Sequence, residues 1–483
     1  MAAQLGYWAS WDQSQTLLEL LDEAKKWPSS QPNFPKQFLS IENSKSLLTN
    51  TLKRITDKSF NSPTIIGNYE HRFLIKKELK ESKIKFDSIL LEPNSKNTMA
   101  SAILSVLHIS NKHLDPLILV LPADHIIVDK KKFIISIKNA ITFAENGFIT
   151  TFGLKPNNPN TSFGYIKTSS KKRNGYLIEK FIEKPNKEIA TQLIKDNNCF
   201  WNSGIFFFSA KTFIKECELH AKKSIDIARK NYQNIIKDLD FYIFQKEYFN
   251  KFKSEPIDIA LMEKTKKGAL VPLNHDWSDV GSWESIWSFK KKDNNGNVSE
   301  SKNVELYDVH NSIILSKNKK VAAIGLENMI IIEDNDGLLI SKKNNDKNLK
   351  VLTERVLKKH VKNIIPYQSV FRPWGEYKTI YSENGFLIKI LRIYPKSKIS
   401  LQYHKKRSEH WVVVEGNATV TQGKKTFILK TNQSTFISQG QIHRLANETS
   451  KPLTLVEVQT GKYLKEDDII RLEDIYGRIK KTS

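Results

Sequence analysis

Two segments near the carboxy terminus carry polar side chains at the spacing of β-strands. Ser400–Trp411 reads Ser-Leu-Gln-Tyr-His-Lys-Lys-Arg-Ser-Glu-His-Trp, and Gly440–Asn447 contains another histidine behind a turn. Side chains two residues apart on a strand share a face, so Gln402 and His404 can point together while His443 approaches from the second segment. A closed β-barrel lets two such segments face one interior. The pattern therefore predicts a small all-β domain with a polar site inside it.

The same segments hold side chains that suit a divalent metal of borderline character, such as Zn²⁺ or Co²⁺. An open position on such a metal would polarise sugar hydroxyl and carbonyl oxygens. Arg407 either holds a substrate phosphate or a developing negative charge, or is one more exposed cation beside Lys405 and Lys406. One histidine in a barrel is usually structural, and a sugar-binding barrel without catalysis is an alternative. Five candidate ligands favour a metal site: Gln402, His404, Glu409, His410 and His443.

The composition is that of a multidomain globular protein, since 483 residues are too many for one core. No stretch approaches the ~18 consecutive apolar residues of a membrane span, and Met1–Ser14 lacks the order of a signal peptide. The two cysteines, Cys199 and Cys217, imply no disulfide framework and fit a reducing cytoplasm. The net charge of +24 allows nucleic-acid binding, but no recognition motif accompanies the scattered lysines. We expect a cytoplasmic protein with neither a nucleic-acid nor a membrane partner.

Apolar strands alternate with helices from Pro63 to Ala269, which predicts an α/β domain with a mainly parallel, Rossmann-like mixed sheet. We expect helices at Thr98–Ser110, with Asn97 as N-cap, and at Lys130–Glu145. The expected buried strands are Thr64–Gly67, Ile89–Glu92, Leu117–Leu121 and Phe148–Gly153.

The pattern changes after the polar, turn-rich stretch 290–297. Short strands over Asn303–Ile340 predict a small β connector, and a polar helix is expected over Leu352–Val361. From Leu387 to Gln459 strand follows strand, as in an all-β barrel. The predicted divisions are an atypical segment 1–26, an α/β domain 27–287, a β connector 288–352 and a β-barrel domain 353–483.

The carboxy-terminal motifs resemble the cupin half of the type II mannose-6-phosphate isomerases, in which a mannose-1-phosphate guanylyltransferase is fused to the cupin. One departure is Lys406, where a second histidine of a His-x-His pair often stands, so Gln402 or His410 is left to complete the ligand set. The resemblance extends over nearly everything from Trp27 onward. It rests on Phe371–Gly375, Leu401–Trp411, Gly440–Asn447, Glu457–Gln459 and Glu466–Arg471.

Two aspartates of the predicted α/β domain follow strand-like segments. Asp124 lies at the end of the apolar Val120–His125 segment, at the sheet edge where ligands bind. Asp279 stands in a second tight loop. Aspartates from separate loops can hold Mg²⁺ on nucleotide phosphates, although a single Asp more often forms a turn or cap. Both strings resemble the sugar nucleotidyltransferases, in which these aspartates bind the metal.

Further short segments resemble those of the sugar nucleotidyltransferase family and follow one another in the same order. Lys36 resembles the lysine of its phosphate segment, while an exposed lysine on a turn is the alternative. Glu92 and Asn97 resemble its base- and ribose-side loop, with departures at Asn94–Lys96 and Met99. The resemblance also implies a sugar-phosphate pocket in which glycine permits close approach, polar groups bond hydroxyls and lysine neutralises phosphate. Its residues would be Gly164, Glu183, Lys184 and Asn202.

The beginning of the chain departs from the family, which opens with an apolar strand and a Gly-rich loop around the nucleotide phosphates. Here no glycine stands between Tyr7 and Trp27, and Thr16–Lys26 has the pattern of an acidic amphipathic helix. We therefore expect Met1–Lys26 to replace both the first central strand and the phosphate loop, as after a frameshift, a wrong start codon or gene decay. A weakened sheet and impaired transfer would follow.

The resemblance implies a two-site enzyme that supplies GDP-mannose for polysaccharide biosynthesis. One site would transfer guanylyl from GTP to mannose 1-phosphate with Mg²⁺, releasing pyrophosphate. The other would interconvert mannose 6-phosphate and fructose 6-phosphate with a metal such as Zn²⁺ or Co²⁺. Two alternatives stay open: an isomerase with an inactive transferase domain, and a non-catalytic sugar-nucleotide-binding remnant. The oligomeric state is open as well, a homo-oligomer included.

Overall fold

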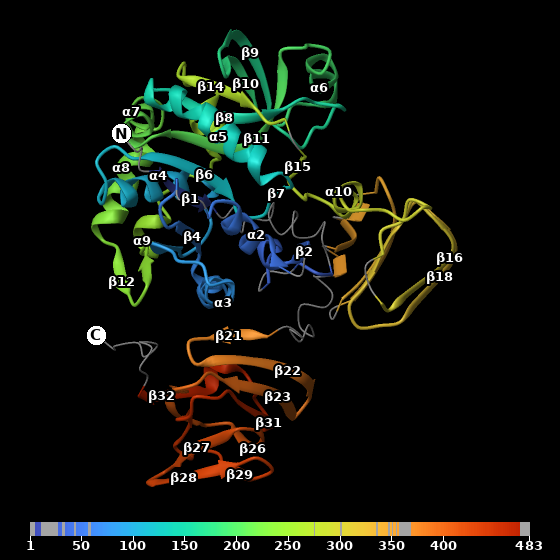
Figure 1. Cartoon of the computed structure of the whole chain (residues 1–483). Coiled ribbons are helices and arrows are strands. Elements are labelled where there is room, and N and C mark those ends of the chain that lie inside the picture. The colour runs from blue at the N-terminus through green and yellow to red at the C-terminus, as the bar shows by residue number, and fades with distance from the viewer. Residues whose placement is uncertain are drawn as a thin grey trace. The chain divides into compact units, whose positions relative to one another are not determined.

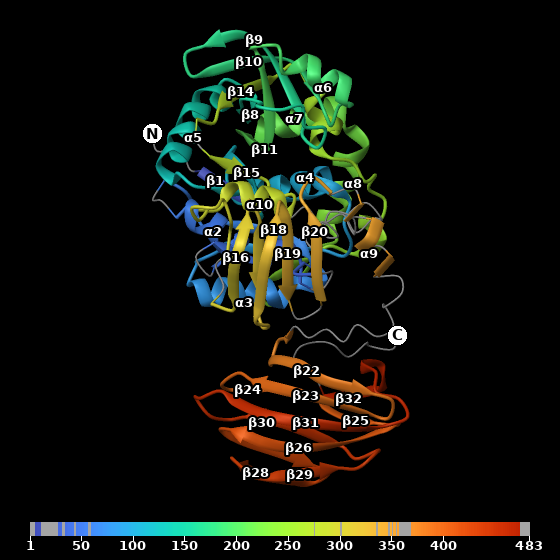
Figure 2. The same cartoon turned by 90° about the vertical axis from the view of Figure 1, so that its right-hand side faces the viewer.

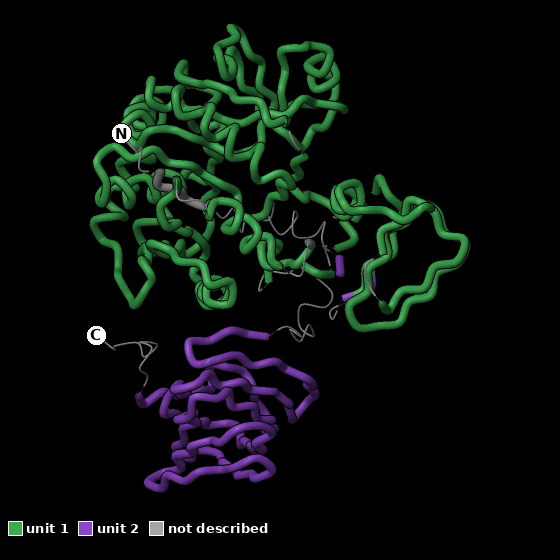
Figure 3. The backbone as a smooth tube through the Cα atoms, in the orientation of Figure 1, with its two compact units in different colours: residues 1–333, 339–354 green, residues 334–338, 355–483 purple. Residues whose placement is uncertain are grey.

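Helices and strands alternate through the amino-terminal half of the chain, whereas strands dominate the rest (Figure 1). The residues group into two units, 1–333 with 339–354 and 334–338 with 355–483 (Figure 3). None of the helices in the described part is long and apolar enough to cross a membrane. The helix predicted at Thr16–Lys26 and most of that at Leu352–Val361 lie outside the described residues. This computed structural model describes residues 5–10, 28–30, 34–42, 45–56, 59–274, 276–299, 302–334, 337–345, 348–349, 351–353, 355–356 and 369–473.

An eleven-stranded mixed sheet in the first unit confirms the predicted α/β class. Its order is β12-β13-β5-β4-β1-β6-β11-β8-β14-β10-β9. Strands β4 and β5 pair in parallel and are buried throughout, as expected where both faces of a sheet are covered. Strand β11 is antiparallel to β6 and β8 and makes the sheet mixed. The bounds are β4 Thr64–Asn68, β5 Ser88–Glu92, β6 Leu117–Pro122, β8 Ile149–Leu154, β9 Tyr165–Lys172, β10 Gly175–Ile182, β11 Cys199–Ser209, β12 Ile236–Asp238, β13 Phe241–Ile243 and β14 Gly268–Pro272.

The amino-terminal strand corrects one prediction. We expected the first central strand to be lost, but β1 (Leu5–Ser10) lies between β4 and β6 and pairs in parallel with both (Figure 1). Its register with β6 runs from Leu5 opposite Leu117 to Ser10 opposite Pro122. The sheet is therefore continuous through its centre, and the predicted weakening does not follow. Residues 11–27, where the family's phosphate loop would fall, lie outside the described part of the chain.

Helices cover both faces of this sheet. On β6, Ile118 and Val120 pack with α4 (Asn97–Ser110), whereas Leu117, Leu119 and Leu121 pack with α5 (Lys130–Glu145), because successive strand residues point to opposite faces. The N-cap of α4 was predicted one residue too late, since Lys96 is the N-cap and Asn97 opens the helix. The other helices are α2 Leu47–Arg54, α3 Arg72–Ser82, α6 Lys187–Leu193, α7 Ala210–His220, α8 Lys222–Gln233, α9 Lys246–Phe249 and α10 Trp283–Phe289.

The predicted β connector follows α10. Strands β16 and β18, seen side by side in Figure 2, pair in parallel. Strands β17 and β19 also pair in parallel. Parallel strands that follow one another so closely form a coil of β-helix type. Ile313 and Ile330 share a core cluster with Trp283 of α10, which ties the connector to the preceding domain. The strands are β16 Val304–His310, β17 Ile313–Ser316, β18 Val321–Glu327, β19 Met329–Asp334 and β20 Gly337–Lys342.

Two antiparallel sheets form the carboxy-terminal domain, as predicted for the all-β cupin barrel. Their orders are β21-β22-β23-β31-β26-β29 and β28-β27-β30-β25-β32, with β24 paired to β30. Trp411, Val420, Leu445 and Leu453 belong to the buried core of this domain. The bounds are β21 Val370–Arg372, β22 Gly375–Glu383, β23 Phe386–Ile393, β24 Ser397–Lys398, β25 Leu401–His404, β26 Arg407–Glu415, β27 Asn417–Gln422, β28 Lys425–Lys430, β29 Ser434–Ile437, β30 His443–Asn447, β31 Leu453–Gly461 and β32 Ile469–Glu473.

Candidate active sites

Three buried polar side chains meet inside the carboxy-terminal barrel. His404 ends β25, Glu409 lies on β26 and His443 begins β30. The Nε2 atoms of His404 and His443 are 3.0 and 3.7 Å from the carboxylate oxygens of Glu409. One ligand atom from each residue lies within 4.8 Å of the others. The structure thus brings together three of the five ligands proposed from the sequence.

The atoms of this cluster fit a divalent cation. His443 Nδ1 is 2.8 Å from the carbonyl oxygen of Gln441, which can only accept, so Nδ1 carries the proton and Nε2 presents its lone pair. Glu409 Oε2 and His443 Nε2 are buried without a hydrogen-bond partner among the described residues. A cation between them would compensate these buried groups.

The charge state of the cluster supports the same conclusion. Burial opposes ionisation of Glu409, but the hydrogen bond and charge of His404, with the charges of His443 and Arg407, outweigh it and hold the pKa of Glu409 well below its ordinary value. Burial lowers the pKa of His443, against the opposing effect of Glu409. A carboxylate held in its ionised form among imidazole nitrogens is a suitable donor set for a divalent metal.

The other two proposed ligands differ from each other, since Gln402 lines the same cavity as Glu409 whereas His410 is exposed. Gln402 is buried opposite His443 in the β25–β30 pairing, and its Oε1 accepts a hydrogen bond of 2.7 Å from the Ser400 hydroxyl. His410 follows Glu409 on the strand and therefore faces outward. It is exposed, and its ring lies edge-on to Phe436 with centroids 6.3 Å apart. The structure does not bring His410 to the cluster.

Arg407 is buried rather than exposed, which contradicts the interpretation of it as one more surface cation. Its Nε donates to Glu409 Oε1 at 3.1 Å, and a terminal nitrogen donates to the Lys465 carbonyl at 2.9 Å. Only 2% of Arg407 is exposed, while Lys405 and Lys406 face solvent. Arg407 therefore fixes one oxygen of Glu409 and leaves the other facing His443.

A cavity of about 50 Å³ beside the cluster is lined by Gln402, Arg407 and Glu409 together with residues that were not selected as site residues from the sequence. Gln459 donates to Glu409 Oε1 at 3.2 Å and to Glu457 Oε2 at 2.8 Å. The indole of Trp411 donates to Glu457 Oε1 at 3.1 Å. Burial and the neighbouring Glu409 raise the pKa of Glu457 to about 8. A second acidic group of variable charge thus stands beside the cluster.

The lining of the cavity also contains an ion pair between a buried lysine and an exposed glutamate. Lys389 Nζ is 2.8 Å from Glu466 Oε1 and lies over the ring of Tyr377, 4.5 Å from its centroid. One available signal was the alternation along β31, where Glu457 and Gln459 continue the inward positions of Leu453 and Leu455. Charged side chains at inward positions of an alternating strand are candidates for a site.

In the first unit, Lys36 joins the two loops that carry the proposed metal-binding aspartates. Lys36, on the short helix η1 (Lys36–Phe38), lies 2.7 Å from Asp124 Oδ2 and also donates to the backbone carbonyl of Asp279. Strand β7 (Ile126–Ile127) pairs with β15 (Trp277–Ser278), so the segments after β6 and before α10 are neighbours. Lys36 is buried, contrary to the alternative of an exposed turn lysine.

The Asp279 loop is shaped by its own backbone. Val280 has a positive φ of 51°, and its N–H donates to the Ser278 hydroxyl at 3.0 Å. A Cβ on Gly281 would lie 2.7 Å from Asp279 Oδ2, so only glycine leaves this carboxylate its space. His125, beside Asp124, is held neutral at pH 7, because burial lowers its pKa to about 4.

Three of the proposed sugar-pocket residues converge. A Cβ on Gly164 would lie 2.5 Å from Glu183 Oε2 and 3.4 Å from Asn202 Cβ. The amide of Asn202 accepts from the Thr151 hydroxyl and donates to Asp258 Oδ1, both at 2.8 Å. Asp258 begins η3, a π-helical turn over Asp258–Met262, a form frequent at functional sites. Asp258 was not selected from the sequence, since a lone acidic residue in an apolar run gives little signal.

The remaining proposed residues are less concentrated. Lys184 is largely exposed, with Nζ 3.6 Å from Glu183 Oε1. Glu92 is buried at the end of β5 and accepts from the Ser101 hydroxyl at 2.6 Å, which ties it to α4. Asn97 has a positive φ of 66°, and its side chain accepts from the N–H of Thr98. Through these hydrogen bonds Glu92 and Asn97 help to fix the segment between β5 and α4.

A row of aromatic rings connects the aspartate loops with the sugar pocket. Trp277 contacts His125 at a centroid distance of 5.2 Å and Phe163 at 5.7 Å. Phe163, next to Gly164, contacts Trp201 at 5.1 Å, and Trp201 precedes Asn202. These contacts connect both groups of residues through packed side chains of the first unit.

Three family descriptions match the chain in succession. Residues 26–296 match nucleotidyl transferase, residues 302–356 the MannoseP isomerase/GMP-like beta-helix domain, and residues 359–474 the mannose-6-phosphate isomerase C-terminal domain. The first match begins at residue 26 and leaves the atypical start outside it. With the cluster in the barrel, these matches define a sugar nucleotidyltransferase fused to a cupin-type isomerase.

The chain belongs to the bifunctional mannose-1-phosphate guanylyltransferase/phosphomannose isomerase family, as the sequence predicted. It is 37% identical over 461 residues to the mannose-1-phosphate guanylyltransferase RfbM of Salmonella typhimurium, covering 95% of this chain and 96% of the relative. It is 36% identical over 458 residues to the alginate biosynthesis protein AlgA of Pseudomonas aeruginosa, covering 94% and 95%. A mannose-1-phosphate geranyltransferase structure from Thermus thermophilus shares the fold, with a TM-score of 0.63 at 23% identity over 74% of this chain and 99% of that one.

Proposed function

We propose that this chain catalyses two steps of GDP-mannose supply, one in each unit. In the first unit, a phosphate oxygen of mannose 1-phosphate would attack the α-phosphorus of GTP. The new P–O bond gives GDP-mannose, and the bond from the α-phosphorus to the β-phosphate oxygen breaks, so pyrophosphate leaves. The supporting observation is the meeting of Lys36, Asp124 and the Asp279 loop. The protein's part is to position the reactants and neutralise their charge.

The proposed roles follow from these positions. Asp124 and Asp279 would hold Mg²⁺, which when bound neutralises charge on the triphosphate. Lys36, now paired with Asp124, would turn its charge toward phosphate oxygens. Gly164, Glu183 and Asn202 would receive the sugar, and Lys184 would lie beside its phosphate. Glu92 and Asn97 would shape the base- and ribose-side loop.

In the second unit we propose interconversion of mannose 6-phosphate and fructose 6-phosphate. His404, Glu409, His443 and Gln402 would hold a divalent metal such as Zn²⁺ or Co²⁺, which when bound polarises the sugar carbonyl. A proton must then move between C2 and C1, and another between their oxygens. Arg407 would keep Glu409 oriented. The buried cluster of two histidines and a carboxylate is the observation that carries this proposal.

The particular substrates and the cellular location belong to the same proposal. The substrates would be GTP, mannose 1-phosphate and mannose 6-phosphate, all of them anions. The buried free thiols of Cys199 and Cys217 agree with a cytoplasmic location. The residues proposed for each site come from one chain, so neither site depends on a second copy. A homo-oligomer is compatible with both sites.

The test is to assay both reactions on the same folded chain. Pyrophosphate release with GTP, mannose 1-phosphate and Mg²⁺, together with conversion of mannose 6-phosphate, would support the two-site enzyme. Isomerisation alone would favour an isomerase with an inactive transferase domain. Neither reaction, with retained binding of GDP-mannose, would favour a non-catalytic remnant.

A further inference from the structure

The turn that carries Asp124 is held on both sides by a single helix. On α2, the Thr51 hydroxyl donates to the carbonyl of Ala123 at 3.3 Å. The Arg54 guanidinium donates to the carbonyl of His125 at 3.1 Å. Thr51 and Arg54 are three residues apart and so lie on one helix face. Their two bonds bracket Asp124, one residue before it and one after.

Both donors lie where water cannot easily replace them. Thr51 is fully buried and Arg54 is 6% exposed. A buried carbonyl that loses its donor is left unsatisfied, so the backbone around it is driven to turn toward another partner. The direction of the Asp124 side chain depends on that backbone.

Helix α2 is itself held in place by its N-cap and by contacts with α3. Ser46 caps its start by accepting from the N–H of Thr49 at 3.0 Å, and both hydroxyls donate to Glu78 of α3. Leu47, in the first turn, shares a core cluster with Ile126 and Val280. The same helix thus contacts the segments that follow Asp124 and Asp279.

We propose that Thr51 and Arg54 are positioning residues for the metal-binding carboxylate of the transferase site. This inference rests on the proposed function of that site. Neither residue touches the substrates. They act by fixing the peptide units on either side of Asp124, so that its carboxylate meets the cation and the triphosphate in one orientation. Such preorganisation lowers the free energy needed to assemble the charged complex.

The test replaces the Thr51 hydroxyl without changing its shape. Thr51→Val removes the donor, and Thr51→Ser retains it. Thr56→Val is the matched control, because Thr56 lies just beyond the same helix, is exposed, and bonds only to the Lys53 carbonyl at 2.8 Å among its described contacts. Mn²⁺ serves as a spectroscopic probe for the Mg²⁺ position. All variants carry Glu409→Gln, so that the barrel cluster does not take up the probe.

The first measurement is GTP-dependent Mn²⁺ binding by electron paramagnetic resonance on the full chain. We expect Thr51→Val to raise the half-saturating Mn²⁺ concentration by about 5- to 20-fold, the range expected for one lost hydrogen bond. Thr51→Ser and Thr56→Val should stay close to the parent. Should Thr51→Val fail to fold, Arg54→Met against Arg54→Lys makes the same comparison at the second donor.

The second measurement is the Mg²⁺ dependence of pyrophosphate release. The half-saturating Mg²⁺ concentration should rise in Thr51→Val, with rescue by Thr51→Ser. Unchanged metal binding in Thr51→Val, or no rescue by serine, would overturn the inference. A parent chain that binds Mn²⁺ with GTP but releases no pyrophosphate would refute only the transferase function, since the binding shifts still decide the role of Thr51. No GTP-dependent Mn²⁺ binding in the parent would overturn both.

Discussion

Glu409 and His410 are neighbours on one strand, yet Glu409 is buried inside the barrel and His410 is exposed to solvent. Replacing Glu409 with Gln removes the carboxylate that faces His404 and His443. We expect this variant to lose bound divalent metal and to fall by more than about 100-fold in isomerase activity, since the effect should exceed that of losing an outer partner. His410→Asn should change neither quantity. Metal content of the purified full chain, measured by elemental analysis, tests the pair.

The two variants differ by one position and so control for each other. A chain that keeps its metal after Glu409→Gln, or loses it after His410→Asn, would contradict the proposed ligand set.

Gly164 gives a prediction about the sugar pocket. A methyl group there would lie 2.5 Å from Glu183 Oε2, so Gly164→Ala must displace that carboxylate. We expect the KM for mannose 1-phosphate to rise at least about 10-fold, a loss of roughly 1.4 kcal/mol of binding. The mannose 6-phosphate reaction of the same preparation is the control. An unchanged KM would show that Glu183 does not contact the sugar.

At the scale of single residues, the sequence predicted which side chains share a face better than it predicted the individual contacts of those side chains. Strand spacing placed Gln402 and His404 on one face, and both are buried, because the alternation of side chains is a local property. It gave no account of Lys389, whose partner Glu466 lies far along the chain. Glu457 entered the sequence analysis only as part of a family-like motif, and its inward position and hydrogen bonds followed from the pairing of whole strands. Long-range partners are set by topology, which one sequence pattern does not contain.

Strand β1 shows how an element can escape prediction. Its sequence, Leu-Gly-Tyr-Trp-Ala-Ser, has no run of β-branched residues, and strand preference depends more on neighbours than on the residues themselves. Pairing with β4 and β6 supplies those neighbours. In contrast, α5 was predicted to the residue, because helical periodicity over Lys130–Glu145 is a local signal.

A proline substitution in β1 tests whether this strand lies at the centre of the sheet. Tyr7→Pro removes a backbone donor from a strand that is paired on both sides, and we expect it to destabilise the first unit by roughly 3 kcal/mol or more. Lys237→Pro, on the outermost strand β12, is the control and should cost much less. Thermal unfolding followed by circular dichroism measures both. Equal effects would contradict a central place for β1.

Glu333 on β19 holds the turn between β17 and β18. Its Oε2 accepts from the Ser316 hydroxyl at 2.7 Å and from the backbone N–H groups of Lys317, Asn318 and Lys319 at 3.0, 2.9 and 3.2 Å. Burial raises the pKa of Glu333, but the hydrogen bonds from Asn318, Ser316 and the adjoining backbone outweigh burial, so the pKa lies below the ordinary 4.5. The ionised form therefore stabilises the fold.

Glu333→Gln should cost about 1–3 kcal/mol at pH 7. Because the folded pKa is lowered, the advantage of the carboxylate is complete above pH 4.5 and disappears as the pH falls through the folded pKa. Hydrogen exchange of the 317–319 amides measures the local effect. Glu327→Gln, the same change at an exposed strand end, is the control. A difference that persists unchanged at low pH would contradict this account.

The proposed residues of each site fall within one unit, which leads to a prediction for the whole molecule. Asp124→Asn should abolish pyrophosphate release and leave isomerisation intact, while Glu409→Gln should do the reverse. Both assays on each variant, with matched folding checks, measure the independence of the sites. Loss of both reactions from either single change would contradict it.

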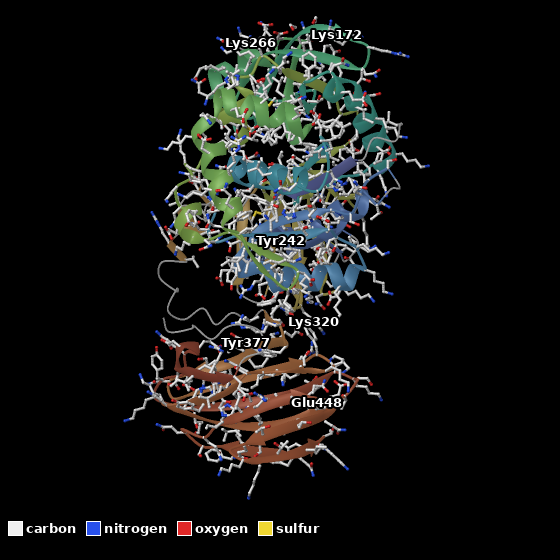
Figure 4. The ribbon with its side chains drawn as sticks, turned by 90° about the vertical axis from the view of Figure 1, so that its left-hand side faces the viewer. Lys172, Tyr242, Lys266, Lys320, Tyr377 and Glu448 are labelled. Atoms are coloured by element: carbon white, nitrogen blue, oxygen red, sulfur yellow. The ribbon has the colours of Figure 1, made fainter. Side chains whose placement is uncertain are left out.

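Part of the positive charge lies at well-separated positions of the first unit. Lys172, Lys266 and Lys320 are exposed at separate points of the first unit (Figure 4). A net charge of +24 raises the local concentration of anions, and the substrates proposed here are all anions. The sign of the net charge agrees with these proposed partners, while the sites themselves required motifs and then coordinates.

The buried cluster of the barrel has a further consequence. His404, Glu409 and His443 come from three strands and meet only when the barrel has closed, so a cation bound by all three would bind the native domain and not the unfolded chain. Without it, buried charged groups oppose closure. The supply of a trace element would then govern how long the carboxy-terminal domain survives proteolysis, and the cell could lose one activity of a fused enzyme while keeping the other.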